Sequence, residues 1–204
     1  MNPRQIRALA RAPRTRLDPE SRREHLLAVG AKLFAEHTYD EVWIDEVARQ
    51  AGVSRGLLYH YFPDKRAFFA AILAAEGKRL AEVTAPDPEL PPLERLRAGL
   101  DAYLGYVEQN PDGYRAVHRG ALSADPQLRS VVEANLERQA QRLLDAIRPD
   151  RQPTDSERLA VHGWLAFLVA TTLRWLDQRT PTRSDVRELC VNTLIAALAA
   201  GREP

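Results

Sequence analysis

The sequence is poor in the residues that build disulfide or thiolate frameworks, because its 204 residues include one cysteine and one methionine. A lone Cys190 cannot form an internal disulfide bond, and it cannot supply a cluster of thiolate ligands. The histidines and carboxylates also lack the spacing that is typical of a metal site. We therefore expect a protein of a reducing compartment, with no metal site and no cofactor.

Long apolar runs and alternating patterns are missing as well. The most apolar stretch, Leu159–Leu176, is interrupted by His162, Gly163 and Arg174, so we predict no membrane-spanning segment. The basic start of the chain lacks the apolar run and the small-residue cleavage site of a signal peptide. No alternation of apolar and polar residues predicts a strand. These absences favour a cytoplasmic protein that is not bound to a membrane.

The charges that are present are nearly balanced, with a formal net charge of +1. Lys and Arg outnumber Asp and Glu by 12 to 9 in residues 1–70, whereas the rest of the chain has 17 against 19. This mild asymmetry does not by itself identify nucleic acid as a partner. Five arginines lie among the first sixteen residues. Residues 1–17 are therefore either a disordered, solubilising arm or an arm that contacts phosphates.

Apolar residues recur at helical spacing along the chain from Asp18 onward. Asp18-Pro19-Glu20 is typical of a helix start, because aspartate caps a helix and proline suits its first turn. Four prolines within residues 85–92 predict a loop. Helices are expected at about residues 18–36, 44–50, 54–61, 64–80, 93–109, 114–118, 128–147, 155–177 and 184–200. The sequence therefore predicts an all-α fold of about nine helices.

The most informative segment is Ala48–Lys65, which has the pattern of a helix-turn-helix. Gly52 suits the left-handed conformation that ends one helix. Val53 is an apolar plug for the turn, and the hydroxyl of Ser54 can cap the next helix. This segment thus predicts two crossing helices, the second of which begins at Ser54.

Leu58 and Phe62 give that second helix one apolar face. The side chains left to face outward are those of Arg55, Tyr59, His60 and Tyr61. Arginine reads guanine and tyrosine hydroxyls reach phosphates, so this face suits a DNA major groove. The interpretation fails if Tyr59 and Tyr61 point inward while a neighbouring carboxylate holds Arg55.

The same segment resembles the TetR family of bacterial regulators. The family pattern is Ala, two residues, Ala-Gly-Val-Ser, one residue, Gly, one residue, Leu-Tyr, one residue, Tyr-Phe, two residues and Lys. Residues 48–65 match every fixed position of it. The resemblance extends over about residues 20–75, and the remainder is similar in helix count alone. It implies an N-terminal three-helix DNA-binding domain at residues 18–63 and a C-terminal helical domain for ligand binding and dimerisation at residues 64–204.

The resemblance also implies roles for single residues. Arg55, Gly56 and Leu57 would approach base edges. Tyr59, His60 and Tyr61 would contact phosphates or thymine methyl groups. The full set of expected DNA-contacting residues is Ser54, Arg55, Gly56, Leu57, Tyr59, His60, Tyr61 and Lys65. Lys65 would lie on a phosphate at the start of the fourth helix.

This chain departs from the family pattern at Val42-Trp43, where a serine or threonine commonly caps the second helix. A lost cap costs about 1 kcal/mol. Trp43 either packs against the first helix or lies on the DNA backbone.

The C-terminal helices predict a partner. The helix at Leu159–Leu176 has apolar residues on two faces, so one face meets the core of the monomer and the other is left for a second subunit. The resemblance implies a homodimer through the last two helices, which in turn implies a palindromic operator. The alternative is a purely intramolecular bundle.

Regulators of this family usually hold a small molecule among their C-terminal helices. Asn135 and Gln139 lie on an apolar stripe, where a buried amide needs a partner. The residues expected to line such a site are Tyr103, Tyr106, Tyr114, His118, Asn135, Gln139, Trp164 and Phe167. The alternative is that they are core residues whose polar groups are satisfied by neighbours.

These patterns favour a repressor that an unknown small molecule releases from a palindromic operator on double-stranded DNA. In that mechanism the ligand shifts the fourth helix, in which Gly77 is a local weak point. We expect no enzyme, because phosphate loops, metalloprotease motifs and nucleophile elbows are missing from the sequence. A second alternative is a helical adaptor that binds protein through the surface of residues 159–198 and never contacts DNA.

Overall fold

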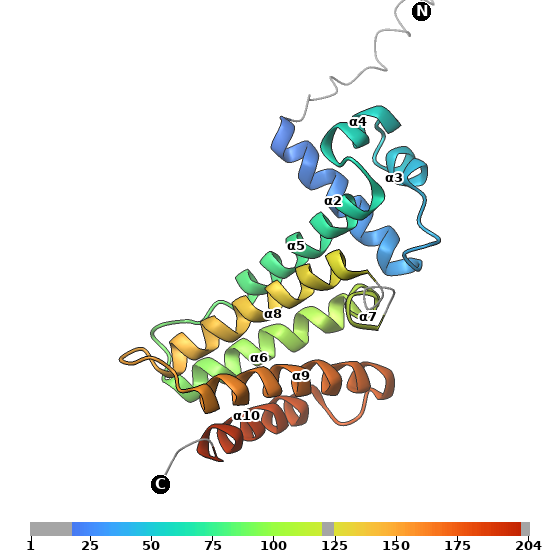
Figure 1. The fold of residues 1–204 in the computed structure, drawn as a ribbon. Coiled ribbons are helices and arrows are strands. Elements are labelled where there is room, and N and C mark those ends of the chain that lie inside the picture. The colour runs from blue at the N-terminus through green and yellow to red at the C-terminus, as the bar shows by residue number, and fades with distance from the viewer. Residues whose placement is uncertain (1–17, 120–124, 201–204) are drawn as a thin grey trace, which may run out of the picture.

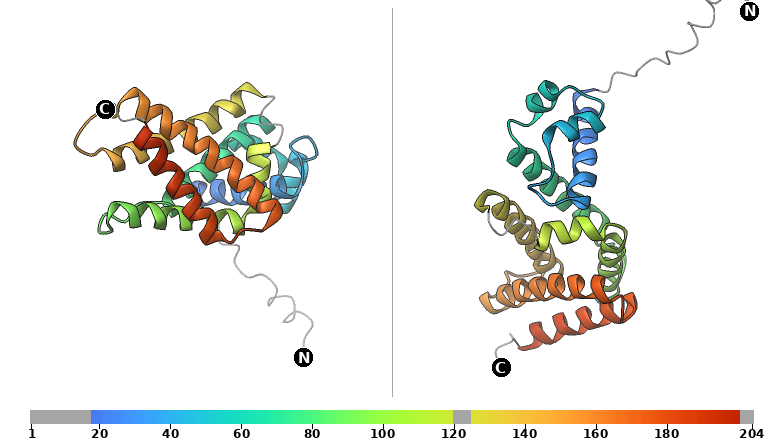
Figure 2. Two further views of the ribbon diagram at one scale, coloured as in Figure 1. Left: turned by 90° about the horizontal axis from the view of Figure 1, so that it is seen from below. Right: turned by 90° about the vertical axis from the view of Figure 1, so that its right-hand side faces the viewer.

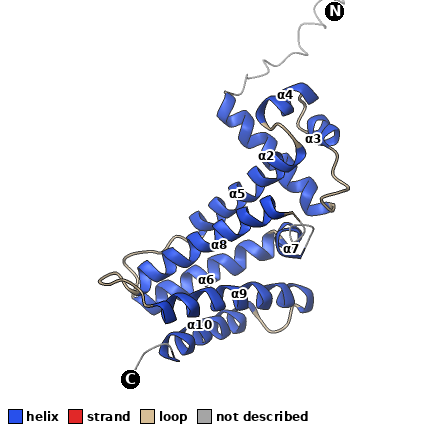
Figure 3. Cartoon of the chain, in the orientation of Figure 1, coloured by secondary structure: helices blue, strands red, loops and turns tan. Residues whose placement is uncertain are grey.

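The computed structural model describes residues 18–119 and 125–200, so the predicted arm at residues 1–17 lies outside the described residues. Every regular element in the described ranges is a helix (Figures 1 and 3). The helices are α2 (Pro19–Glu36), α3 (Ile44–Gln50), α4 (Arg55–Tyr61), α5 (Lys65–Val83), α6 (Pro92–Gln109), α7 (Pro111–Arg119), α8 (Pro126–Ile147), α9 (Asp155–Gln178) and α10 (Arg183–Ala200). The predicted all-α class is confirmed.

Several helix starts in the described residues are fixed by local side-chain caps. The carboxylate of Asp18 accepts hydrogen bonds from the backbone N–H groups of Glu20 and Ser21, at 3.0 Å each. Asp64 accepts from the N–H of Ala67 at 2.7 Å and so starts α5. These residues satisfy N–H groups that have no partner inside the helix.

Two apolar cores lie one behind the other along the molecule. The N-terminal core joins α2, α3, α4 and the first half of α5, and its fully buried members include Leu26, Val47, Leu58 and Phe68. The C-terminal core joins α6 to α10 and includes Leu104, Val161, Cys190 and Leu194. Figures 1 and 2 show α3 and α4 at one end of the molecule and α9 and α10 at the other. The helix α5 runs from the first group to the second.

Two glycines allow α5 to pack closely against its neighbours. A Cβ atom at Gly30 of α2 would overlap the side chains of Phe68 and Ile72. A Cβ atom at Gly77 of α5 would overlap the side chain of Asn135 on α8. Gly77 is therefore a point of close helix contact, a role that the sequence did not predict.

The helix α9 has apolar side chains on two faces, one buried and one exposed. Trp164, Leu168 and Trp175 are buried in the C-terminal core, whereas Leu159 is 75% exposed. By length and composition alone α9 is apolar enough to cross a membrane, so the expectation that no stretch reaches that level was wrong. In the fold, α9 packs against both α8 and α10.

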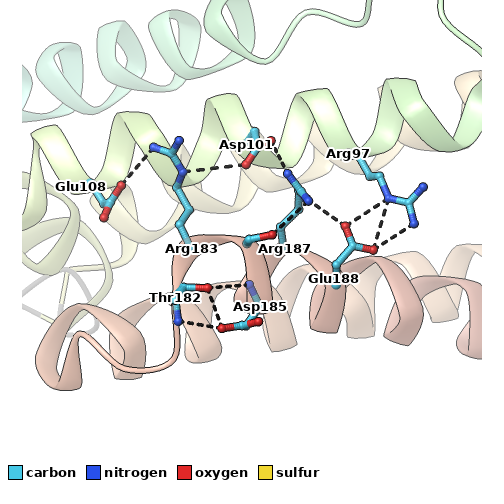
Figure 4. A network of polar contacts seen from close by, with 9 residues as sticks. Arg97, Asp101, Glu108, Thr182, Arg183, Asp185, Arg187 and Glu188 are labelled. Atoms are coloured by element: carbon cyan, nitrogen blue, oxygen red, sulfur yellow. Dashed lines mark hydrogen bonds and ion pairs between the residues drawn. The ribbon is translucent and has the colours of Figure 1, made fainter.

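An ion-pair network fastens α10 to α6 (Figure 4). The guanidinium of Arg97 forms a two-pronged contact with Glu188 at 2.9–3.2 Å. Arg187 Nη1 lies 2.6 Å from Asp101 Oδ2. Each partly exposed pair is worth at most about 1 kcal/mol, so the network fixes the position of α10 more than it raises stability.

Glu157 joins the end of α8 to the start of α9. Its carboxylate accepts hydrogen bonds from Arg151 at 2.7 and 2.9 Å and from Arg148 at 2.7 Å. It also accepts from the N–H of Thr154, whose hydroxyl caps the N–H of Glu157 in return. These hydrogen bonds, those from Arg151 first, lower the pKa of Glu157 to about 2.

The lowered pKa of Glu157 makes a testable contribution to acid stability. A carboxyl group with a depressed folded-state pKa stabilises the fold fully above its ordinary pKa of 4.5 and loses that effect as the pH falls toward 2. We expect Glu157→Gln to lower the unfolding temperature at neutral pH and to flatten its decline below about pH 5. Thermal unfolding followed by circular dichroism checks this.

The matched control is Glu133→Gln, which changes an exposed glutamate of α8. It should follow the wild-type pH profile. An unchanged profile in the Glu157→Gln protein would contradict the assigned role of this carboxylate.

Candidate DNA interface and ligand cavities

The turn between α3 and α4 has the geometry that its sequence predicts. Gly52 has a φ of 66°, in the left-handed region where glycine is favoured. The N–H of Val53 donates to the carbonyl of Ala48 at 3.0 Å. The hydroxyl of Ser54 accepts from the N–H of Leu57 at 3.2 Å and starts α4. The segment is a helix-turn-helix.

The two faces of α4 differ as expected. Leu58 and Phe62 are buried in the N-terminal core. Gly56 and His60 are exposed. Tyr59 and Tyr61 are partly buried and pack against the N-terminal core with part of each side chain, so neither is fully internal.

Arg55 has a carboxylate partner, which meets one of the two conditions that together would end the interpretation. Its Nη1 lies 3.1 Å from Asp45 Oδ2 on α3, and both side chains are 63% exposed. The guanidinium also lies 5.4 Å from the centre of the Tyr59 ring. The expectation that no carboxylate holds Arg55 was wrong, because α3 brings Asp45 beside it. An exposed pair of this kind is worth less than about 1 kcal/mol, so another anion can replace Asp45.

The ammonium group of Lys65 has contacts within the protein that a fully exposed lysine lacks. Its Nζ donates to the carbonyl of Asp40 at 3.4 Å and lies 4.5 Å from the centre of the Tyr39 ring. Partial burial lowers its pKa. Contact between Lys65 and a phosphate stays a prediction.

Trp43 is 73% exposed and occupies the N-cap of α3 without forming a side-chain cap bond. The alternative in which Trp43 packs against the first helix was therefore wrong. The cap is missing, as Val42-Trp43 predicted.

Two cavities lie among the helices behind the helix-turn-helix. One, of about 430 Å³, is lined by α2, α5, α6, α7 and α8. The other, of about 750 Å³, is lined mainly by α6, α8, α9 and α10. Both volumes fall in the range of small-molecule sites. Five residues line both cavities and form the wall that they share: Leu80, Tyr114, His118, Leu136 and Gln139.

Seven of the eight residues expected at a ligand site line one of these cavities. Tyr106 and Asn135 line the smaller one, and Tyr103 and Trp164 line the larger one. The remaining three belong to the shared wall, namely Tyr114, His118 and Gln139. Phe167 lines neither cavity and packs, partly buried, against the C-terminal core. Its expected place at a ligand site is not supported.

The aromatic hydroxyl groups of the cavities have partners within the protein. The hydroxyl groups of Tyr103 and Tyr114 are hydrogen-bonded to each other, and burial raises the pKa of Tyr103 to about 12. The hydroxyl of Tyr106 donates to Glu76. Burial lowers the pKa of His118 to about 4, so this imidazole is neutral at physiological pH.

The amides also have partners. Asn135 Nδ2 donates to the carbonyl of Leu73 at 3.1 Å, and Gln139 Oε1 accepts from Arg142 at 3.2 Å. Each amide thus has a partner within the protein, as the core alternative held, although both side chains line a cavity. Sequence reasoning missed Arg95 and Arg142, which line the larger cavity. The one available signal was that Arg142 follows Asn135 by two helical turns on the same face.

Two family models match the chain. Residues 26–72 match the model described as bacterial regulatory proteins, tetR family. Residues 92–197, about half of the chain, match the model described as tetracyclin repressor-like, C-terminal domain. The matched ranges cover both the helix-turn-helix and the helices that enclose the cavities.

Similar proteins include a transcriptional activator and a transcriptional repressor. The transcriptional activator FasR of Mycolicibacterium smegmatis is 28% identical, over 83% of this chain and 79% of FasR. The transcriptional repressor KstR of Rhodococcus jostii is 29% identical, over 86% of this chain and 84% of KstR. A TetR-family regulator from Streptomyces coelicolor has a similar structure, with a TM-score of 0.79 and 29% identity over 91% of this chain and 83% of that one. With this fold and these matches, the chain belongs to the TetR family of helix-turn-helix, DNA-binding transcription regulators.

Proposed function

We propose that this regulator is a cytoplasmic repressor, which binds a palindromic operator as a homodimer and leaves it when a small molecule fills the cavities. The observation on which this rests is the placement of α4, a capped helix on a rigid core at the end of the molecule opposite α9 and α10 (Figure 1). The proposed division is a DNA-binding domain at residues 18–63 and a ligand-binding and dimerisation domain at residues 64–204.

The proposed DNA contacts start from the exposed side of α4. Arg55 exchanges Asp45 for a base edge or a phosphate. Gly56 has no neighbouring atom within 4 Å of a built Cβ, so the helix backbone itself can approach the groove there. The remaining proposed contacts to bases and phosphates are those of Ser54, Leu57, Tyr59, His60, Tyr61 and Lys65.

The proposed dimer interface is the apolar outer face of α9 and α10. Leu159 and Leu189 are 75% and 49% exposed. Ala166 and Ala170 of α9 are exposed beside them, and small residues let two helices approach closely. Covering this face with a second copy removes apolar surface from water and places two α4 helices on one side of the dimer.

Two helices can transmit the presence of a ligand to the helix-turn-helix. The helix α7 packs against α2 and supplies Tyr114 and His118 to both cavities. The helix α5 contributes Phe68 to the N-terminal core and Leu80 to the shared cavity wall. A ligand that prefers one packing of these helices changes operator affinity, by about 5- to 150-fold for a coupling of ~1–3 kcal/mol.

The test of DNA binding is a selection of operators from randomised duplexes, followed by a salt titration. Affinity should fall steeply with salt, because basic side chains displace counter-ions from phosphates. Arg55→Ala should weaken operator binding by about 5- to 150-fold, the ~1–3 kcal/mol of one base contact.

Lys78→Ala is the control for that variant, because Lys78 is an 80% exposed cation of α5 away from α4. It should leave operator binding unchanged. Failure to select any duplex would favour the adaptor alternative, whereas equal affinities for the two variants would contradict the contact proposed for Arg55.

The dimer interface has its own test. Ala166→Arg places a long cation on the exposed face of α9 and should convert the dimer into monomers at micromolar concentration. Light scattering coupled to size exclusion measures the mass. Ala134→Arg, at an exposed alanine of α8, is the matched control and should remain dimeric. A dimer that tolerates Ala166→Arg would place the interface elsewhere.

A further inference from the structure

The side chain of Trp43 is a large aromatic group that the fold leaves uncovered. It is 73% exposed, whereas the other exposed large apolar side chains of the described residues lie in α5, α6, α9 and α10. Tryptophan is highly buried on average, because its ring is apolar and its N–H needs a hydrogen-bond partner. Trp43 instead presents both the ring and the donor to solvent, beside the helix-turn-helix.

The backbone holds this indole in an outward position. Val42 and Ile44, on either side of it, are buried in the N-terminal core. The carbonyl of Trp43 accepts hydrogen bonds from the N–H groups of Glu46 at 3.0 Å and Val47 at 3.2 Å. The backbone of Trp43 is extended, so its side chain points away from the core that its two neighbours enter. A partner of the indole therefore meets a residue whose backbone is already ordered.

The other two tryptophans show how the fold satisfies this side chain elsewhere. Trp164 and Trp175 are buried in the C-terminal core. Their Nε1 atoms donate to the backbone carbonyl groups of Cys190 and Pro181, at 2.8 Å each. Among the described residues, the Nε1 of Trp43 has no such acceptor. Its ring and its N–H are both left for a contact outside the chain.

The segment around Trp43 touches two residues that are proposed to contact DNA. Asp45, two positions later, is paired with Arg55 at the start of α4. The backbone carbonyl of Asp40, three positions earlier, accepts a hydrogen bond from Lys65 at the start of α5. The short segment that presents the indole is thus held against the first residues of α4 and α5. An indole at this place continues the DNA interface of the helix-turn-helix.

The remaining carboxylates beside Trp43 have partners of their own. Glu41 accepts hydrogen bonds from the N–H and the hydroxyl of Thr38, at 2.8 Å each. Glu46 accepts from Arg49 Nε at 2.9 Å. A carboxylate repels a phosphate, whereas the indole N–H is an uncharged donor that a phosphate oxygen accepts. The indole is therefore the group of this segment that suits a DNA backbone.

We propose that Trp43 binds the sugar-phosphate backbone of DNA, with its ring against a deoxyribose and its N–H donated to a phosphate oxygen. Such a contact positions α4 in the groove and carries no sequence information, because every nucleotide presents the same sugar and phosphate. The residue that leaves α3 without a side-chain cap thus acts on DNA. This inference rests on the proposed function in taking the exposed side of α4 as the side that faces DNA.

Affinity measurements separate this contact from a contact made by a charge. Trp43→Ala should weaken binding of the selected operator and of a random duplex by the same factor, about tenfold. Because the indole displaces no counter-ion, the slope of log affinity against log salt should stay that of the wild type. Lys65→Ala removes a proposed phosphate contact that is charged, and it should reduce this slope by about 1.

Two further variants complete the series. Val83→Ala is the matched control, because Val83 is an exposed apolar residue at the far end of α5. It should bind both duplexes as the wild type does. Trp43→Phe keeps a ring and loses the N–H, so its affinity should lie between those of the wild type and Trp43→Ala.

Two outcomes of this series would overturn the assignment. Unchanged affinity of Trp43→Ala for both duplexes would show that the indole makes no contact. A loss confined to the selected operator would show that the indole reads a base and does not bind the backbone.

Tryptophan fluorescence gives a readout that a purely structural role of Trp43 would not change. The chain has three tryptophans, and Trp43 alone among them is exposed to acrylamide, a neutral quencher. Saturating duplex DNA should lower the quenching of the wild type to the level of Trp43→Phe, whose two remaining indoles are buried. Quenching of Trp43→Phe should not respond to DNA. If DNA leaves the quenching of the wild type unchanged, the indole still faces water in the complex and the inference is wrong.

The failure of this inference differs from the failure of the proposed function. If an operator is selected and Trp43 stays open to acrylamide in the complex, the contact is wrong and the regulator stands. If a random duplex shields Trp43 while no operator can be selected, the backbone contact stands and the sequence-specific function fails.

Discussion

The close packing of α5 is the constraint on which the rest of the structure depends. Its first half contributes Phe68 to the core beneath the helix-turn-helix, where Gly30 leaves room for the ring. Its second half meets α8 at Gly77 and lines both cavities through Leu80. Because interiors are packed as densely as crystals, a shift of one half cannot be absorbed within the helix. The helix α5 thus joins the walls of both cavities to the core beneath α4.

Helix boundaries and the helix-turn-helix could be predicted because their causes are local. Asp18, Ser54 and Asp64 cap helices through N–H groups no more than three residues away. Gly52 adopts the left-handed backbone conformation that the turn requires. The periodicity of α9 likewise predicted two apolar faces, of which the one with Trp164 is buried in the chain and the one with Leu159 is exposed. Such signals depend on the chain near the residue and not on the tertiary fold.

The predictions that failed, or that could not be made, depend on contacts between distant segments. The guanidinium of Arg55 is paired with a carboxylate because Asp45 lies on the neighbouring helix, ten residues earlier. Phe167 lies beside the C-terminal core while Trp164, one turn away, lines the cavity. Arg95 gave no sequence signal, because its place in the wall of the larger cavity is a property of the folded chain.

The central claim is that filling the larger cavity changes the positions of the two helix-turn-helix units. Spin labels at Gln50→Cys, an exposed site on α3, report the distance between those units in the dimer, since native Cys190 is buried. In the operator complex, the distance between the two labels should be the one expected when the two recognition helices lie about 34 Å apart, one turn of DNA. A ligand found to occupy the larger cavity should shift this distance. A distance distribution that stays the same in the presence of saturating ligand would contradict it.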